Sequence, residues 1–277
     1  MKNSVEQAKG NASFHYNVPA EFFAHILDES FTYSSAMFAS NDESLSAAQA
    51  RKIATAIDKT AVPQGGTLLE IGSGWGACSL AAARRGINVV AVSPAKNQID
   101  FSRKRAADEG LHVEFLECDY RNATGIYDGI VSIEMIEAVG AGNIGEFFES
   151  ASDRLKSNGV FFLQFIYSSH ARMVLSGRRD TWIRRNIFPG GQILSKQIVN
   201  SAAASAGFRL EYSMELGHDY ARTLKLWGDR LQAAEGHLCS GGMKRHDFRR
   251  WIFYFRMCEA GFRAQEIGCV QWALRRV

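Results

Sequence analysis

Three glycines at alternating positions form the most informative chemical pattern in the chain. Gly72, Gly74 and Gly76 directly follow an apolar run at residues 67–71, and residues 77–85 have the composition of a helix. Because glycine has no side chain, the backbone of such a turn approaches a ligand closely, and the helix N-terminus offers free N–H groups. The pattern predicts a nucleotide-binding turn between a strand and a helix.

The spacing of these glycines and the acid before them narrow the kind of ligand. The sequence reads G-x-G-x-G and not the G-x-G-x-x-G of dinucleotide-binding proteins. Glu70, two residues before the first glycine, suits a ligand that carries an amino group. An amino acid joined to a nucleoside meets both conditions, and S-adenosylmethionine is the commonest such cofactor. A tight strand-to-helix turn without a ligand is the alternative, which the geometry of the motif disfavours.

A pair of carboxylates follows the buried run at residues 129–133. Glu134 and Glu137 are three residues apart, which places them on one helical face if a turn forms there. An acid beside a sulfonium or an incipient carbocation acts electrostatically or as a base. The alternative is two solvated acids at the start of a helix.

Polar residues after two other expected strands would suit the nucleoside. Residues 91–98 contain no acid, so Ser93 and Gln98 are the expected ribose partners. Asp119 follows the next strand, where an adenine amino group would donate to it. Asp119 as the cap of a turn or helix is the equally supported alternative.

Apolar runs alternate with helical segments from residue 67 onward, as in a parallel sheet covered on both faces. We predict an α/β fold with a Rossmann-like, seven-stranded class I methyltransferase sheet, because a dehydrogenase would need a second nucleotide-binding half. Helices are expected at residues 97–109 and 145–155. The expected strands are residues 67–71, 88–92, 113–117, 129–133, 160–166, 208–216 and 267–274.

Three segments lie outside this minimal core. Residues 1–66 are expected to form an N-terminal helical cap that precedes a methyltransferase domain at residues 67–277. Insertions at about 168–195 and at 220–262, the second with two aromatic-rich helices, would lie over the ligand crevice. We therefore expect them to form a substrate lid.

Composition excludes several other classes. The chain has 277 residues, of which 46% are apolar and 22% charged, with a net charge of +3, so nucleic acid is not an expected partner. No apolar run is long enough to cross a bilayer, and the polar N-terminus lacks a signal sequence, which predicts a cytoplasmic protein without stable membrane insertion. Five scattered cysteines are expected to be reduced thiols, with no metal site.

Five motifs in order along the chain carry a family resemblance. Together they resemble the cyclopropane-fatty-acid synthase and mycolic acid cyclopropane synthase family of S-adenosylmethionine-dependent methyltransferases, from about residue 13 to the C-terminus. The segment 134–140 (EMIEAVG) is similar to that of many bacterial and plant members. The motifs are residues 14–18 (FHYNV), 33–38 (YSSAMF), 70–76 (EIGSGWG), 187–191 (IFPGG) and 219–224 (DYARTL).

The resemblance implies that an alkene carbon attacks the sulfonium methyl, after which the carbocation loses a proton from the added methyl and closes a three-membered ring. In the family a bound bicarbonate is thought to accept that proton. The residues that match its polar nest are Ser35, Glu137, Gln164 and Tyr220. Those that match the cofactor site are Tyr33, Ser34, Gly72, Gly74, Ser93, Gln98 and Asp119, with Ile133 at the methyl end.

The sequence departs from the family in two respects. Ser35 stands where the family usually has cysteine, and its hydroxyl would still donate to a bicarbonate oxygen. This change bears on ring closure more than on methyl transfer, which needs mainly alignment of the reactants. The N-terminal domain of the phospholipid-modifying members has no counterpart here, so a carrier-bound unsaturated chain or a small molecule is the expected substrate.

Several alternatives stay open on sequence alone. Five arginines in the first insertion either attract an acidic carrier, phosphate or diphosphate or form a solvated face. They are Arg172, Arg178, Arg179, Arg184 and Arg185. Aromatic residues that would shield a cation are Tyr33, Phe188, Tyr220, Trp227 and Phe255, with core packing favoured for the last two. Methyl transfer to nitrogen or another heteroatom, and non-catalytic cofactor binding, are the competing functions. The sequence does not predict an oligomeric state.

Overall fold

A seven-stranded mixed sheet forms the centre of the protein, seen here in a computed structural model that describes residues 6, 10, 20–177 and 179–277. The strand order is β3-β2-β1-β4-β5-β7-β6, and β7 runs antiparallel to both of its neighbours. This confirms the predicted Rossmann-like methyltransferase sheet. The strands are β1 (Thr67–Ile71), β2 (Asn88–Ser93), β3 (Val113–Glu117), β4 (Tyr127–Ile133), β5 (Leu155–Ser168), β6 (Phe208–Glu215) and β7 (Ile267–Arg276).

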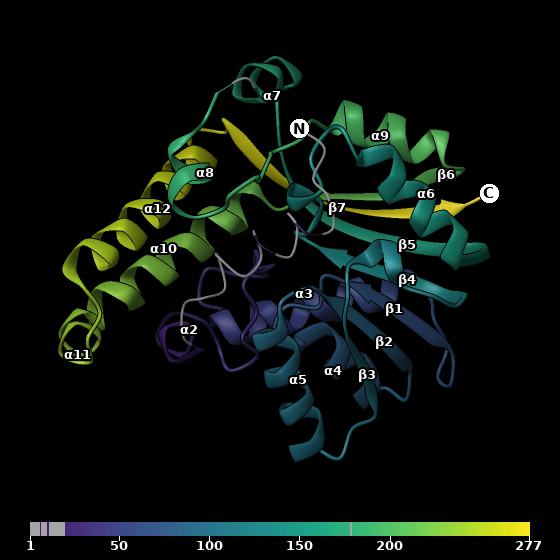
Figure 1. Ribbon diagram of the computed structural model, residues 1–277, viewed down its shortest axis with the longest axis horizontal. Helices are drawn as coiled ribbons and strands as arrows, with labels where there is room; N and C mark the ends of the chain where they lie inside the picture. The colour runs from purple at the N-terminus through teal and green to yellow at the C-terminus, as the bar shows by residue number, and fades with distance from the viewer. Residues whose placement is uncertain (1–5, 7–9, 11–19, 178) are drawn as a thin grey trace.

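Helices cover both faces of this sheet (Figure 1). On one face lie α3 (Leu45–Thr60), α4 (Ala77–Arg84) and α5 (Lys96–Asp108). On the other face lie α6 (Ile144–Arg154) and α9 (Lys196–Ser205). Parallel strands that are covered on both sides are apolar on both sides, which explains the continuous apolar runs in the sequence.

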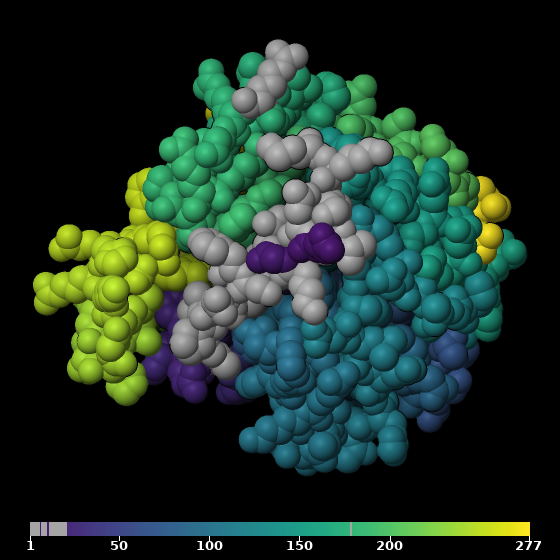
Figure 2. Space-filling view, viewed as in Figure 1, coloured from purple at the N-terminus to yellow at the C-terminus, as the bar shows by residue number. Residues whose placement is uncertain are grey.

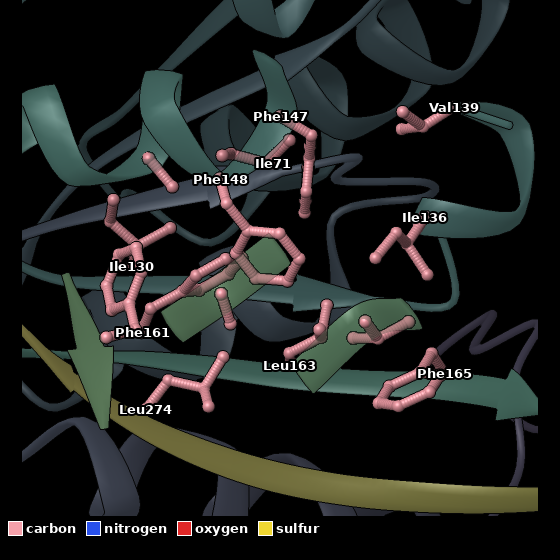
Figure 3. Packing of buried hydrophobic residues seen from close by; sticks show 14 of the residues in the cluster. Ile71, Ile130, Ile136, Val139, Phe147, Phe148, Phe161, Leu163, Phe165 and Leu274 are labelled. Carbon is pink, nitrogen blue, oxygen red and sulfur yellow. The ribbon is translucent and has the colours of Figure 1, made fainter. Parts of the chain in front are cut away.

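Aromatic and branched side chains fill the layer between the sheet and α6. Phe147 and Phe148 of α6 are fully buried and pack against Phe161 on β5, with ring centroids 5.8 and 6.0 Å away (Figure 3). Ile130 and Leu163 extend the same cluster along the neighbouring strands. This packing fixes the carboxyl ends of β4 and β5, from which site residues project.

A helical arm extends from the sheet edge over the carboxyl ends of the strands. It consists of α10 (Gly217–Ala233), α11 (Glu235–Ser240) and α12 (Arg245–Arg263), and α10 also packs on α2 (Ala20–Ile26). Figure 2 shows this yellow-green arm beside the green segment that contains α7 (His170–Gly177) and α8 (Trp182–Asn186). The region expected to hold two helices thus holds three, because the short α11 has no apolar periodicity of its own.

Two other predicted boundaries differ from the structure. Strand β5 begins at Leu155 and not at residue 160, because the residues after Leu155, Lys156 to Asn158, are polar and exposed and so interrupt the apolar run. Helix α6 correspondingly ends at Arg154. The motif at residues 14–18 lies outside the described residues, and the division into a cap at 1–66 and a domain at 67–277 stays a prediction. Helix α3 of that cap packs on the sheet itself, beside α4.

No helix among the described residues is long and apolar enough to span a bilayer. All five cysteines are free thiols. Over the same described ranges, no cluster of three or more His, Cys, Asp or Glu side chains has the geometry of a metal site.

Candidate active site

A cavity of about 1040 Å³ opens at the carboxyl ends of the central strands and extends under the helical arm. Twelve of the candidate cofactor-binding and catalytic residues line it, whereas Ser35 and Gln164 lie directly behind its wall. The lining residues are Tyr33, Ser34, Glu70, Gly72, Gly74, Ser93, Gln98, Asp119, Ile133, Glu134, Glu137 and Tyr220.

The glycine turn has the backbone geometry that the sequence implied. Gly72 has a φ of +83°, and a Cβ atom there would lie 2.6 Å from Cγ of Met135, so no side chain fits. Gly74 has a φ of +51° and no heavy atom within 4 Å of a Cβ position, so a side chain would enter the cavity. The turn therefore leaves open space at the point where a ligand would approach the backbone.

Glu70 occupies the end of β1 beneath this turn. Its buried carboxylate accepts a hydrogen bond from the hydroxyl of Ser79 in α4. Desolvation raises the pKa of Glu70 to about 7, while the Ser79 hydrogen bonds and the charge of Lys52 act in the opposite direction. Glu70 therefore lines the cavity with a carboxyl group whose pKa lies close to neutral pH.

The residues expected to contact the nucleoside also serve local structure. The Ser93 hydroxyl accepts the N–H of Ala95 at 3.2 Å. Asp119 caps the 3-10 helix η1 (Tyr120–Asn122) and forms an ion pair with Arg121 at 2.7 Å, so the capping role proposed as the alternative is present. Both side chains nevertheless line the cavity.

Lys52, a fully buried lysine on α3, was not among the site residues expected from the sequence. Its Nζ donates to Oγ of Ser34 at 2.6 Å and lines the cavity. Desolvation lowers the pKa of Lys52, and the nearby charge of Glu134 opposes that effect. A signal was present, because Gln49 and Lys52 interrupt the apolar face of α3 at helical spacing. A buried polar side chain in such a face needs a partner or a ligand.

Glu134, and not Glu137, lies at the centre of a buried polar nest. Its Oε1 accepts the N–H of Ser35 at 2.9 Å and the amide of Gln164 at 2.7 Å. Its Oε2 accepts the hydroxyl of Tyr220 at 2.6 Å. Desolvation raises the pKa of Glu134, although these donors and Lys52 favour the ionised form. The family-matched position Glu137 is therefore not the carboxylate that meets Ser35, Gln164 and Tyr220.

Glu137 has a different environment at the start of the 3-10 helix η2 (Ile136–Ala138). Its Oε1 accepts the N–H of Ile166 at 2.6 Å, and its buried Oε2 has no hydrogen-bond partner among the described residues. Desolvation and the charge of Glu134 raise the pKa of Glu137 to about 8. The interpretation of Glu134 and Glu137 as two solvated acids is thus wrong, and they do not share a helical face, because Glu134 precedes the turn with a φ of +51°.

Ser35 contributes to the nest through its backbone. Its hydroxyl donates to the carbonyl of Ala36 at 2.9 Å, so the expected donation from this hydroxyl toward the nest is absent.

The aromatic candidates divide as the sequence suggested. Tyr33, Phe188 and Tyr220 line the cavity, whereas Trp227 and Phe255 are packed in the core.

The arginines of the insertion are mostly engaged in structure. Arg172 pairs with Glu266. Arg184 donates to the carbonyls of Gly191 at 2.6 Å and Ser176 at 3.1 Å. Arg185 pairs with Asp180 at 2.8 Å, Arg179 lines the cavity, and Arg178 lies outside the described residues. These contacts hold the insertion together and occupy three of the five arginines, Arg172, Arg184 and Arg185.

The sequence matches known proteins over nearly all of its length. The family model described as mycolic acid cyclopropane synthetase matches residues 3–272. The tuberculostearic acid methyltransferase UfaA1 of Mycobacterium tuberculosis is 37% identical over 284 residues, which cover 99% of this chain. The chain spans 66% of the length of that relative.

Solved structures of similar proteins share the fold. The cyclopropane synthase MmaA2 from Mycobacterium tuberculosis is 32% identical, with a TM-score of 0.89 over 96% of this chain and 98% of that one. Mycolic acid cyclopropane synthase CmaA1, complexed with SAH and CTAB, is 30% identical, with a TM-score of 0.90 over the same shares of the two chains. The resemblance drawn from the motifs is confirmed, and the chain belongs to the mycolic acid cyclopropane synthetase family of S-adenosylmethionine-dependent methyltransferases.

Proposed function

We propose that the protein transfers a methyl or methylene unit from S-adenosylmethionine to an alkene carbon of a lipid-like, isoprenoid or natural-product chain. The observation that carries this proposal is the continuity of the cavity. It joins the glycine turn at Gly74 to the carboxylate of Glu134 and continues to apolar side chains of the arm such as Phe262. Donor and acceptor would thus meet in one cavity.

The residues present fit the donor. Open space lies beside Gly74, and the buried hydroxyl of Ser73 has no partner among the described residues. The ammonium of Lys52 suits a carboxylate, and Glu70 suits an amino group, the two charged groups of an amino acid. When bound, S-adenosylmethionine supplies an electrophilic methyl group. The other residues that we expect to hold it are Tyr33, Ser34, Gly72, Ser93, Gln98, Asp119 and Ile133.

The far part of the cavity suits an apolar acceptor. A volume of about 1040 Å³ lies at the upper end of the about 300–1,000 Å³ of typical ligand pockets, which suits a site for both a donor and an acceptor. Two of the arginines that line it, Arg172 and Arg184, are paired or bonded to carbonyls, which argues against a phosphate or diphosphate site. The apolar side chains that line this part are Leu175, Phe188, Leu224, Met257, Phe262 and Ile267.

The protein's own groups would then guide the reaction. The walls hold the alkene against the methyl group and exclude water, an orientation effect that lowers the barrier. The rings of Tyr220 and Phe188 line the cavity and would stabilise a developing cation through their faces. Glu137, whose pKa of about 8 keeps it protonated at neutral pH, adds no second negative charge beside Glu134.

Methyl transfer to a heteroatom is the second candidate, and one observation favours it. Glu137 lines the same cavity as Glu134, and its buried Oε2 has no hydrogen-bond partner among the described residues, so it would accept an N–H of an amine beside the Glu134 carboxylate. If the acceptor is an amine, Glu137→Gln should weaken its binding with little effect on turnover.

Mass spectrometry of acceptors incubated with the protein and methyl-labelled S-adenosylmethionine tests the proposal. The acceptors are an unsaturated acyl chain as free acid, phospholipid and carrier thioester, a prenyl chain and a set of amines. We expect one labelled CH2 unit on an unsaturated chain and none on the saturated chain of equal length. Label on amines alone would establish the second candidate, and no label on any acceptor would refute both.

A further inference from the structure

The nest behind the cavity already contains an anion that belongs to the protein. The carboxylate of Glu134 accepts hydrogen bonds from Ser35 N, from Gln164 Nε2 and from the Tyr220 hydroxyl, at 2.9, 2.7 and 2.6 Å. The thiol of Cys269 approaches Oε1 at 3.8 Å. The Gln164 side chain is itself held in place, because its Oε1 accepts Nε2 of Gln271 at 2.9 Å.

A bound bicarbonate, which the family resemblance implies, does not fit this arrangement. It would need the donors that now serve Glu134, namely those of Ser35, Gln164 and Tyr220. The Ser35 hydroxyl, the remaining expected donor, is turned to the Ala36 carbonyl. A second anion against the Glu134 carboxylate would also be repelled in a desolvated site. The residues present therefore disagree with a separate bicarbonate.

We propose that the Glu134 carboxylate is the catalytic proton acceptor and takes the place of a bound anion; this rests on the proposed alkene methylation. The alkene π pair forms a bond to the methyl carbon, and the carbon–sulfur bond breaks with its electrons going to sulfur. A C–H bond of the added methyl then breaks, and its electron pair closes the ring on the cationic carbon. Glu134 Oε2 takes the proton and releases it to solvent with the product.

The geometry leaves Oε2 free to act in this way. Among the described residues, Oε2 accepts a single hydrogen bond, from Tyr220, and a carboxylate oxygen has room for another. Glu134 lines the cavity, whereas the donors on Oε1 lie behind it. The backbone of Glu134 is in the left-handed region, with a φ of +51°, a costly conformation for glutamate that persists only where the surroundings hold it.

The charges around the nest favour Glu134 over Glu137 as the acceptor. Glu134 has three hydrogen-bond donors and the positive charge of Lys52 nearby, which favour its ionised form. Glu137 has only backbone donors, the N–H groups of Ile166 and of Glu137 itself, and desolvation and the neighbouring charge of Glu134 raise its pKa to about 8. At neutral pH the negative charge of the pair therefore resides on Glu134.

Turnover in buffer freed of carbon dioxide, with and without added bicarbonate, tests the proposal. The wild-type rate should not respond to bicarbonate. Glu134→Gln should lose about 100-fold or more, as expected for a general base, while S-adenosylmethionine binding by calorimetry is kept. Glu134→Gly suits the positive φ and empties the nest, so bicarbonate should partly restore its activity. Glu215→Gln, an exposed carboxylate on β6, is the matched control and should behave as wild type.

A second measurement keeps this test separate from the proposed function. Titration of labelled bicarbonate, followed by NMR, should show binding to Glu134→Gly and none to the wild type, whatever the acceptor proves to be. Bicarbonate binding by the wild type, a wild-type rate that depends on bicarbonate, or full activity of Glu134→Gln would overturn the proposal. If no alkene is methylated, the proposed function fails, while the titration still decides what occupies the nest.

Discussion

The two ends of the cavity are built in different ways. At the glycine end, one continuous stretch supplies the geometry, and the key atoms belong to the backbone of Gly72 and Gly74. At the nest, Glu134 meets partners that lie 99, 30 and 86 residues away in sequence, on Ser35, Gln164 and Tyr220. The first end is set by local conformation and the second by the completed fold.

This difference predicts different sensitivities. A turn that exists to keep side chains away from a ligand should fail in binding when a side chain is added. A network of buried hydrogen bonds should fail in chemistry when one donor is removed, because the remaining charge loses its compensation. Substitutions at the two ends should therefore separate binding of the donor from turnover.

The largest expected effect is at the glycine end. Gly74→Leu should weaken S-adenosylmethionine binding by about 100-fold or more, equivalent to about 2.7 kcal/mol, because the side chain would enter the cavity. Gly110→Leu is the matched control, since Gly110 also has a positive φ of +64° and open space but lies at the end of α5. Calorimetry should show normal binding for the control, and equal losses in both variants would contradict this role for Gly74.

Removal of a single hydroxyl tests the nest. Tyr220→Phe deletes the donor to Glu134 and should lower turnover by about 10- to 100-fold, as expected for a hydrogen bond to a charged group worth about 1.5–3 kcal/mol. Binding of S-adenosylmethionine should stay unchanged. Tyr127→Phe removes a hydroxyl bonded to the Thr124 carbonyl away from the cavity and serves as the control. Equal rates for the two variants would show that the Tyr220 hydroxyl has no part in the reaction.

The same contrast explains what sequence reasoning could reach. The sheet, the glycine turn and the family were predictable, because apolar runs, alternating glycines and ordered motifs are local signals. The partner of Ser35 was not, since the motif alignment pointed to Glu137 while a positive φ at Glu134 directs the other carboxylate into the nest. The role of Lys52 was not predictable either, because its burial depends on how α3 packs on the sheet.

The pKa of Glu137 makes stability depend on pH. Its pKa is raised from 4.5 to about 8, so between these values the folded state holds a proton that the unfolded state has lost. The free energy of unfolding should therefore fall as the pH rises through this window. Urea unfolding of Glu137→Gln should show a smaller fall, by about 1–2 kcal/mol between pH 6 and 8. Glu215→Gln should keep the wild-type slope, and an unchanged slope in Glu137→Gln would show that this carboxyl ionises normally.

The smallest expected effect is at the rim of the cavity. Arg172 of α7 pairs with Glu266, which precedes β7, and both side chains are about half exposed. An exposed pair contributes about 0.2–1 kcal/mol, so Arg172→Met should raise KM for the acceptor at most about fivefold, with kcat and donor binding unchanged. The effect should vanish in high salt, because screening weakens the pair in the wild type as well. Arg209→Met, which breaks an exposed pair with Glu211 on β6, should leave KM unchanged. A fall in kcat for Arg172→Met would instead mean that the rim is coupled to the nest, and the separation between the two ends of the cavity would not hold.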